Sequence, residues 1–164
     1  MRALALVLFA ALAAPAAAET YGDAYGLGDH PAAPVQGGGL GDLVHVTAEL
    51  LKADGSPADR VAPGEVVSVR VSVSRAADRP AVQLRLHCTL YFTNADNEDS
   101  PGTEGTCLDA RVGGGETVAL NVRLKFRGSA EDRPETYGVA VEVKDEISGE
   151  ALSLMPTWTW EGAE

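Results

Sequence analysis

This chain is poor in the residues that build metal and nucleophilic centres. Its 164 residues include only two cysteines and three histidines, and aromatic side chains make up 5% of the sequence. It contains no H-E-x-x-H pair, no phosphate-binding P-loop and no dinucleotide-binding glycine motif. The Gly-Ser pairs at residues 55–56 and 128–129 do not follow the pattern of a strand-to-helix elbow, where a nucleophilic serine would lie. We therefore nominate no catalytic residue from the sequence.

Basic residues are also scarce. The chain carries 13 Lys and Arg against 24 Asp and Glu, which gives a formal net charge of -11. Recognition of nucleic acid or of an anionic membrane surface needs patches of basic side chains. The charge balance therefore predicts a protein that binds neither, and it is typical of an acidic protein kept soluble outside the cell.

Long apolar runs are missing after the first 18 residues. The chain opens with MRALALVLFAALAAPAAAET, in which Arg2 precedes an apolar run over residues 3–14 and small residues follow Pro15. This order is that of a signal peptide with an A-x-A cleavage site after Ala18. The run is too short to span a bilayer comfortably. We expect residues 1–18 to be removed, and the rest to be periplasmic or secreted, without membrane insertion.

Export decides how the two cysteines are interpreted. Two cysteines in an oxidising compartment most simply form one disulfide, here between Cys88 and Cys107. A metal site would need further ligands, and the candidate third ligand, His87, points to the opposite face of the strand from Cys88. A crosslink of this span contributes about 3 kcal/mol to stability in the chain-entropy model. We expect the disulfide to staple an acidic loop that strand pairing would leave floppy.

The residues after the cleavage site differ from the rest of the chain. Residues 19–42 are rich in glycine and show almost no periodicity. They predict a flexible leader. Tyr21 and Tyr25 in this leader are either a docking motif for a partner or solvated side chains.

From residue 43 the sequence alternates between apolar and polar side chains. The alternating runs cover residues 44–50, 65–75, 81–92, 107–112, 116–126, 136–145 and 151–160. Strict alternation means that each strand buries one face. About seven such strands separated by Gly, Pro and Asp turns predict an all-β domain over residues 43–164, an antiparallel immunoglobulin-like β-sandwich. A small barrel is the alternative. Cys88 lies on the apolar face of its run, so the disulfide is expected to be buried.

Three segments together carry a family resemblance. They are VTAELLKADGSPADRVAPGEVVSVRV, GGGETVALNVRL and TYGVAVEVKDEISGE, spread over residues 44–150. This succession resembles the carbohydrate-binding C-terminal domain of O-antigen ABC-transporter ATPases. The resemblance implies a β-sandwich and glycan binding. The chain departs from that family in having a signal peptide and a cysteine pair and no nucleotide-binding domain, and no site residue is carried over.

The segment between the cysteines offers oxygen ligands. Side chains that suit Ca²⁺ are those of Asn94, Asp96, Glu98, Asp99 and Glu104. The spacing begins like an EF-hand loop but fails, because Asp99 stands where glycine is required and Gly105 stands where the bidentate glutamate belongs. Two interpretations stay open: an irregular Ca²⁺ site, or a solvated acidic loop. No other cofactor is expected, and Asp96 and Glu104 are also ligand-binding candidates.

Two tryptophans near the C-terminus are the remaining binding candidates. Trp158 and Trp160 lie on one face of the last alternating run, where they can form a stacking platform for sugar rings. They also continue the apolar side of Leu152 and Leu154, which favours a place in the core.

These patterns favour an exported, non-enzymatic binding module for a glycan or an envelope protein. The alternative is a structural or accessory subunit of a cell-envelope assembly, and a hydrolase with paired carboxylates comes third. Exposed aromatic side chains on the sandwich would favour glycan binding. An ordered leader along an edge strand would favour assembly.

Overall fold

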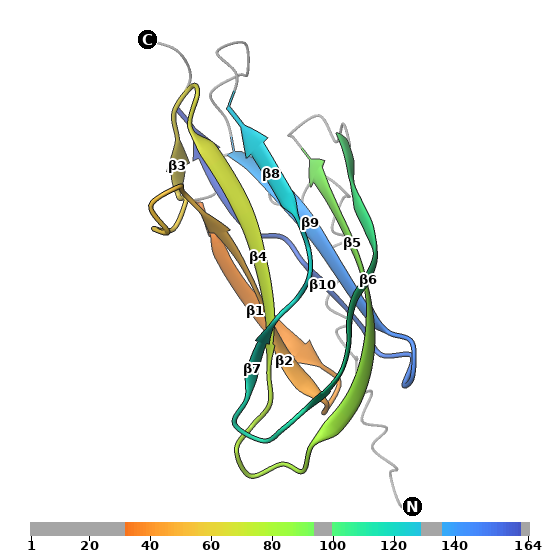
Figure 1. Cartoon of the computed structure of the whole chain (residues 1–164). Coiled ribbons are helices and arrows are strands. Elements are labelled where there is room, and N and C mark those ends of the chain that lie inside the picture. Colours follow the sequence, from red (N-terminus) through yellow and green to blue (C-terminus); the bar gives the residue numbers. More distant parts are fainter. Residues whose placement is uncertain (1–31, 94–99, 129–135, 162–164) are drawn as a thin grey trace, which may run out of the picture.

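A computed structural model describes residues 32–93, 100–128 and 136–161 of the chain. These residues form two β-sheets with a shared hydrophobic core between them, and no helix is present among them (Figure 1). Within the same residues, no helix has the length and apolarity needed to cross a membrane. The all-β prediction and the two-layer sandwich are therefore confirmed.

The first sheet, sheet A, has the strand order β1-β2-β4-β7, with β8 pairing further along β4. Its strands are β1 (Val35–Leu40), β2 (Val44–Leu51), β4 (Val66–Ser74), β7 (Thr117–Ala119) and β8 (Leu124–Arg127). All of its pairings are antiparallel.

The second sheet, sheet B, has the order β3-β11-β9-β5-β6, with β10 pairing beside β9. Its strands are β3 (Arg60–Val61), β5 (Val82–Thr93), β6 (Ser100–Val112), β9 (Thr136–Asp145), β10 (Ala151–Leu154) and β11 (Thr157–Trp160). Among the described strands of this sheet, only β3 and β11 pair in parallel, over two residues.

The strand count is higher than the predicted seven. The structure has eleven strands in its described residues, because two of the expected runs are broken and two short strands are added. The run over residues 116–126 divides into β7 and β8, and between them the N–H of Asn121 donates to the carbonyl of Cys107 in sheet B. The last run divides at Pro156, which has no N–H to offer a sheet.

The predicted flexible leader is wrong for residues 35–40. This segment is β1, which pairs antiparallel with β2 from Val35↔Glu49 to Leu40↔Val44. Glycines make the same backbone hydrogen bonds as other residues, and their missing side chains leave room for neighbours. A Cβ atom on Gly38 would lie 3.1 Å from a methyl carbon of Leu152 in sheet B. The signal peptide and residues 19–31 lie outside the described residues.

Alternation along the strands builds the core as predicted. The inward positions of sheet A include Val67, Val69, Val71 and Val73 on β4, and those of sheet B include Leu84, Leu86 and Leu90 on β5 and Val139, Val141 and Val143 on β9. Their outward neighbours are more exposed, for example Ser72 on β4 and Glu142 on β9. Each sheet therefore has one apolar inner face and one polar outer face.

Candidate functional site

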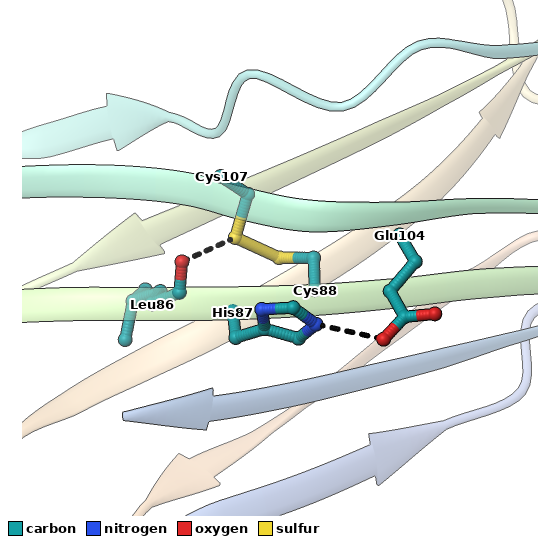
Figure 2. Close-up of a disulfide and its surroundings, with 5 residues drawn as sticks. All are labelled: Leu86, His87, Cys88, Glu104 and Cys107. Atoms are coloured by element: carbon teal, nitrogen blue, oxygen red, sulfur yellow. Dashed lines mark hydrogen bonds and ion pairs between the residues drawn. A yellow bond between two sulfur atoms is a disulfide. The ribbon is translucent and has the colours of Figure 1, made fainter. Parts of the chain in front are cut away.

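The two cysteines form a disulfide that bridges β5 and β6. The Cα atoms of Cys88 and Cys107 are 5.7 Å apart, and both side chains are buried (Figure 2). The predicted disulfide and its burial are confirmed. A disulfide sulfur is no thiolate ligand, so the Cys-ligated metal site is ruled out while the bond is intact. The Cys107 sulfur lies 3.4 Å from the carbonyl oxygen of Leu86.

A β-bulge turns Cys107 toward the core. Up to Leu86↔Leu108 the two strands pair in one register, but the next pair is His87↔Thr106, so that Cys107 is an extra residue on β6. An extra residue reverses which positions of a strand face inward. Without it, Cys107 would share the outer face with Asp109 and Arg111.

The disulfide does not close the base of an unpaired loop, as the sequence had suggested. Pairing of β5 with β6 continues beyond it, through Thr89↔Glu104 and Leu90↔Thr103 to Phe92↔Ser100. Gly102 makes this continuation possible at a second irregularity in the register. A Cβ atom there would lie 1.4 Å from the carbonyl oxygen of Leu90, which no side chain could accommodate. The crosslink therefore lies inside a long hairpin.

The candidate Ca²⁺ ligands Asn94, Asp96, Glu98 and Asp99 lie outside the described residues, so their role stays a prediction. Glu104 is described: it faces outward on β6, and its Oε1 lies 3.2 Å from Nε2 of His87. No group of three or more His, Cys, Asp or Glu side chains that could hold a metal ion occurs in residues 32–93, 100–128 and 136–161.

The tryptophan pair belongs to the core. Trp158 is 4% exposed and Trp160 is 2% exposed. The ring of Trp158 packs against those of Phe126 (4.5 Å between centroids) and Tyr137 (5.5 Å). The interpretation as a sugar-stacking platform is wrong, because neither indole face is open to a ligand. The alternative, closure of the core, is confirmed.

A groove that the sequence did not predict crosses the outer face of sheet B. It consists of three hollows of about 460, 320 and 300 Å³ that share lining residues. The first two share His87 and Lys144, and the last two share Glu142 and Ser153. The groove extends along β9 from beside Glu146 to Ala140, a length of about 20 Å at 3.3 Å per residue. We call it the outer groove.

Short side chains between longer ones make the outer groove hollow. Its lining includes Thr89, Ala151 and Ser153, which give little height above the sheet, beside the longer His87 and Lys144. At the far end the lining includes Tyr91, Met155 and the side chain of Gln36, whose Oε1 accepts a hydrogen bond from the N–H of Met155 (2.8 Å).

The two ends of the outer groove differ in the side chains that line them. Ala140 faces outward yet is only 3% exposed, and its cross-strand partner is Tyr91. Met155 covers the neighbouring position, since a Cβ atom on Gly138 would lie 2.7 Å from its sulfur. The opposite end carries charged side chains, Lys144 and Glu146. A ligand in the groove would thus meet the aromatic ring of Tyr91 and the thioether of Met155 at one end, and Lys144 and Glu146 at the other.

Hydrogen bonds fix several side chains of the outer groove. The Tyr91 hydroxyl donates to Oε1 of Glu142 (3.4 Å). His87 pairs with Glu104 on the neighbouring strand β6 (Figure 2). These contacts join β5 to β9 on one side and to β6 on the other. The groove therefore presents a partly ordered set of donors and acceptors.

A buried carboxylate supports the β9–β10 turn beside the groove. Asp145 is 1% exposed and accepts hydrogen bonds from the N–H of Arg85 (3.0 Å) and from the N–H and hydroxyl of Ser148 (2.9 and 2.7 Å). Burial is the largest single influence on its pKa and raises it, but the hydrogen bonds from Ser148 and Arg85 together outweigh burial and leave the pKa below its ordinary value. Asp145 is therefore a charged turn anchor.

Comparison with known proteins adds no family to this description. No protein-family model matches the chain, and no curated protein matches its sequence. Function therefore has to be argued from the geometry of the sandwich.

Proposed function

We propose that the protein is an exported, non-enzymatic binding module that holds a glycan segment in the outer groove. The observation that carries this proposal is the continuity of the three hollows, since together they form a long trough with an aromatic end. Extended ligands bind along troughs of this kind, where a few placed polar groups fix the orientation of the ligand.

The lining of the outer groove suits a sugar chain. Sugar rings offer apolar C–H faces, which pack on aromatic side chains, and hydroxyl groups, which pair with carboxylates and amides. Tyr91 supplies an aromatic ring and Met155 adds apolar surface beside it. Glu142 supplies a carboxylate, Gln36 an amide and Ser153 a hydroxyl group. The resemblance to carbohydrate-binding sandwich domains, drawn from the sequence, points to the same ligand class.

A second candidate function is that of an accessory subunit in a cell-envelope assembly. It is favoured by β1, a strand within the segment that the sequence predicted to be a flexible leader. This strand is at the edge of sheet A, next to β2, and its Val35 is 45% exposed. In this case a protein partner would contact β1, and substitutions in the outer groove would leave assembly unchanged.

The glycan proposal is tested by screening the mature protein on a glycan array, with and without Ca²⁺, and by titrating each hit. Replacing Tyr91 by Ala removes the aromatic surface and should weaken binding about tenfold, or ~1.4 kcal/mol. The Lys144→Ala change should also weaken binding. The matched control is Lys125→Ala, an exposed lysine on β8 of the other sheet.

Two outcomes would contradict this proposal. One is the absence of any glycan hit in either condition. The other is a glycan for which the Tyr91→Ala and Lys144→Ala variants have the same affinity as the Lys125→Ala control. Hydrolysis of a bound glycan, measured by the release of reducing ends, would contradict the non-enzymatic part.

Export is tested separately by intact mass. We expect the protein recovered from the periplasm or medium to begin at Glu19, because the A-x-A site ends at Ala18. A mass that retains Met1 would refute the predicted processing.

A further inference from the structure

A second hollow lies away from the outer groove, where the β1–β2 turn meets the loop after β4. Its volume is about 420 Å³. The residues that matter for its chemistry are Asp42, Leu43, His45, Arg75 and Arg79. We call it the arginine hollow.

Backbone carbonyls hold the first guanidinium of the arginine hollow in place. Nε of Arg75 donates to the carbonyl of Pro80 (2.5 Å), and an Nη of Arg75 donates to the carbonyl of Leu43. A carbonyl accepts a hydrogen bond but does not neutralise the positive charge. Arg75 is therefore a fixed cation with donors left over, since a guanidinium has five N–H groups.

Four basic residues elsewhere in the described chain are neutralised by acids. Ion pairs with carboxylates are made by Lys52 with Glu65, Arg60 with Glu161, Arg70 with Glu49 and Arg85 with Asp109. In contrast, Arg79 is exposed, and its side chain makes no hydrogen bond or ion pair with any described residue. The hollow thus gathers two cations that no described carboxylate pairs with in an ion pair.

Two carboxylates border the same region and limit its positive charge. Asp42 is part of the lining, and the carboxylate of Glu150 lies against Gly41, where an added Cβ atom would be 2.9 Å from its Cδ. With a net charge of -11, the chain as a whole also repels anions. Attraction of an anion to the hollow would therefore depend on short-range bonds to Arg75, Arg79 and His45.

We propose that the arginine hollow binds a small oxyanion group, a carboxylate or a phosphate. A guanidinium binds such a group through charge-assisted hydrogen bonds, and Arg75 keeps three of its five N–H groups for this on a side chain that two carbonyls already hold in place. His45 adds an exposed imidazole to the lining. Binding here is independent of the outer groove, and salt should weaken it because the site is open to solvent.

The test is an NMR titration of the amide signals of the mature protein at constant ionic strength. The probes are inorganic phosphate and glucuronate, which separate the two sources of an oxyanion, and glucose is the neutral control. We expect saturable shifts in residues 39–45 and 74–79 with at least one anion and none with glucose. Arg79→Ala should weaken binding roughly tenfold, as for the loss of a charged hydrogen bond.

The control variant is Arg123→Ala, which removes an exposed arginine between β7 and β8. It should leave the affinity unchanged, whereas Arg79→Ala should not, and both variants keep the Arg75 clamp. Three results would overturn the proposal: no saturable shift with either anion, equal weakening by the two variants, or saturable shifts confined to the outer groove.

Discussion

The two faces of sheet B are built from the same strands and differ in almost every physical respect. The inner face carries Leu86, Val141 and the Cys88–Cys107 disulfide, all buried. The outer face carries His87 and Lys144 among short side chains, and it is hollowed. Successive residues of a strand point to opposite sides, so one sequence can specify both faces. The inner face holds the two sheets together, and the outer face is left open to the proposed ligand.

The largest loss of stability should follow a substitution on the inner face. Replacing Trp158 by Ala removes the ring that packs on Phe126 and Tyr137, and should lower the free energy of unfolding by about 3–5 kcal/mol. Denaturant unfolding followed by circular dichroism measures the change. A loss below about 1 kcal/mol, which is typical of surface positions, would contradict the buried place of this ring.

The disulfide should have the next largest effect. Replacing Cys88 and Cys107 together by Ala should cost about 3 kcal/mol, because the unfolded chain regains the freedom of the 19-residue separation. Thiol labelling of the unfolded, unreduced wild type should give no signal. Quantitative labelling would mean that the cysteines are free.

A smaller effect is expected at Asp145, and it should depend on pH. Its folded pKa lies below the ordinary value of 3.8, so its contribution to stability is present above that value and is lost as the pH falls through the folded pKa. Asp145→Asn should cost about 1–3 kcal/mol at neutral pH, since an amide N–H₂ group would face the donors of Ser148. Urea unfolding at pH 7 and near pH 3 measures both stabilities.

The difference in free energy of unfolding between the wild type and Asp145→Asn should be smaller at the lower pH. Glu65 also has a lowered pKa, chiefly because it accepts a hydrogen bond from the N–H of Ala62. It is present in both proteins, so its own pH dependence cancels from the difference between their stabilities. An equal gap at both pH values would show that the charge of Asp145 does not stabilise the turn.

The smallest effect on stability is expected on the outer face. Lys144→Ala and Ser153→Ala should each change the free energy of unfolding by no more than about 0.5 kcal/mol, as is usual for exposed positions. Thermal melting beside the wild type checks this. A loss comparable to that of the disulfide would mean that the outer face also maintains the fold, and the comparison between the faces would fail.

The sequence predicted the inner face well because alternation reports burial directly. Valines and leucines at every second position gave the core strands, and the same parity placed Cys88, Trp158 and Trp160 inside. The position of Cys107 required a bulge, which alternation does not reveal. The β1 strand was missed because glycines have no side chains that could alternate.

The outer groove could not be predicted because it depends on which strands are neighbours. Tyr91 and Glu142 are 51 residues apart, and only the pairing of β5 with β9 brings them into contact. Polar positions on the separate strands were visible in the sequence. Their arrangement around short side chains could not be seen there, because it depends on the register in which β5 and β10 pair with β9.

The most direct test of the account is to map a bound ligand onto the two sheets. Amide chemical shifts of the mature protein would be followed while an oligosaccharide identified on the array is added. We predict that the perturbed residues cluster on β5, β9 and β10, around Thr89, Tyr91 and Ser153. Perturbations centred on the outer face of sheet A, around Thr47 and Ser72, would contradict the assignment of recognition to the outer groove.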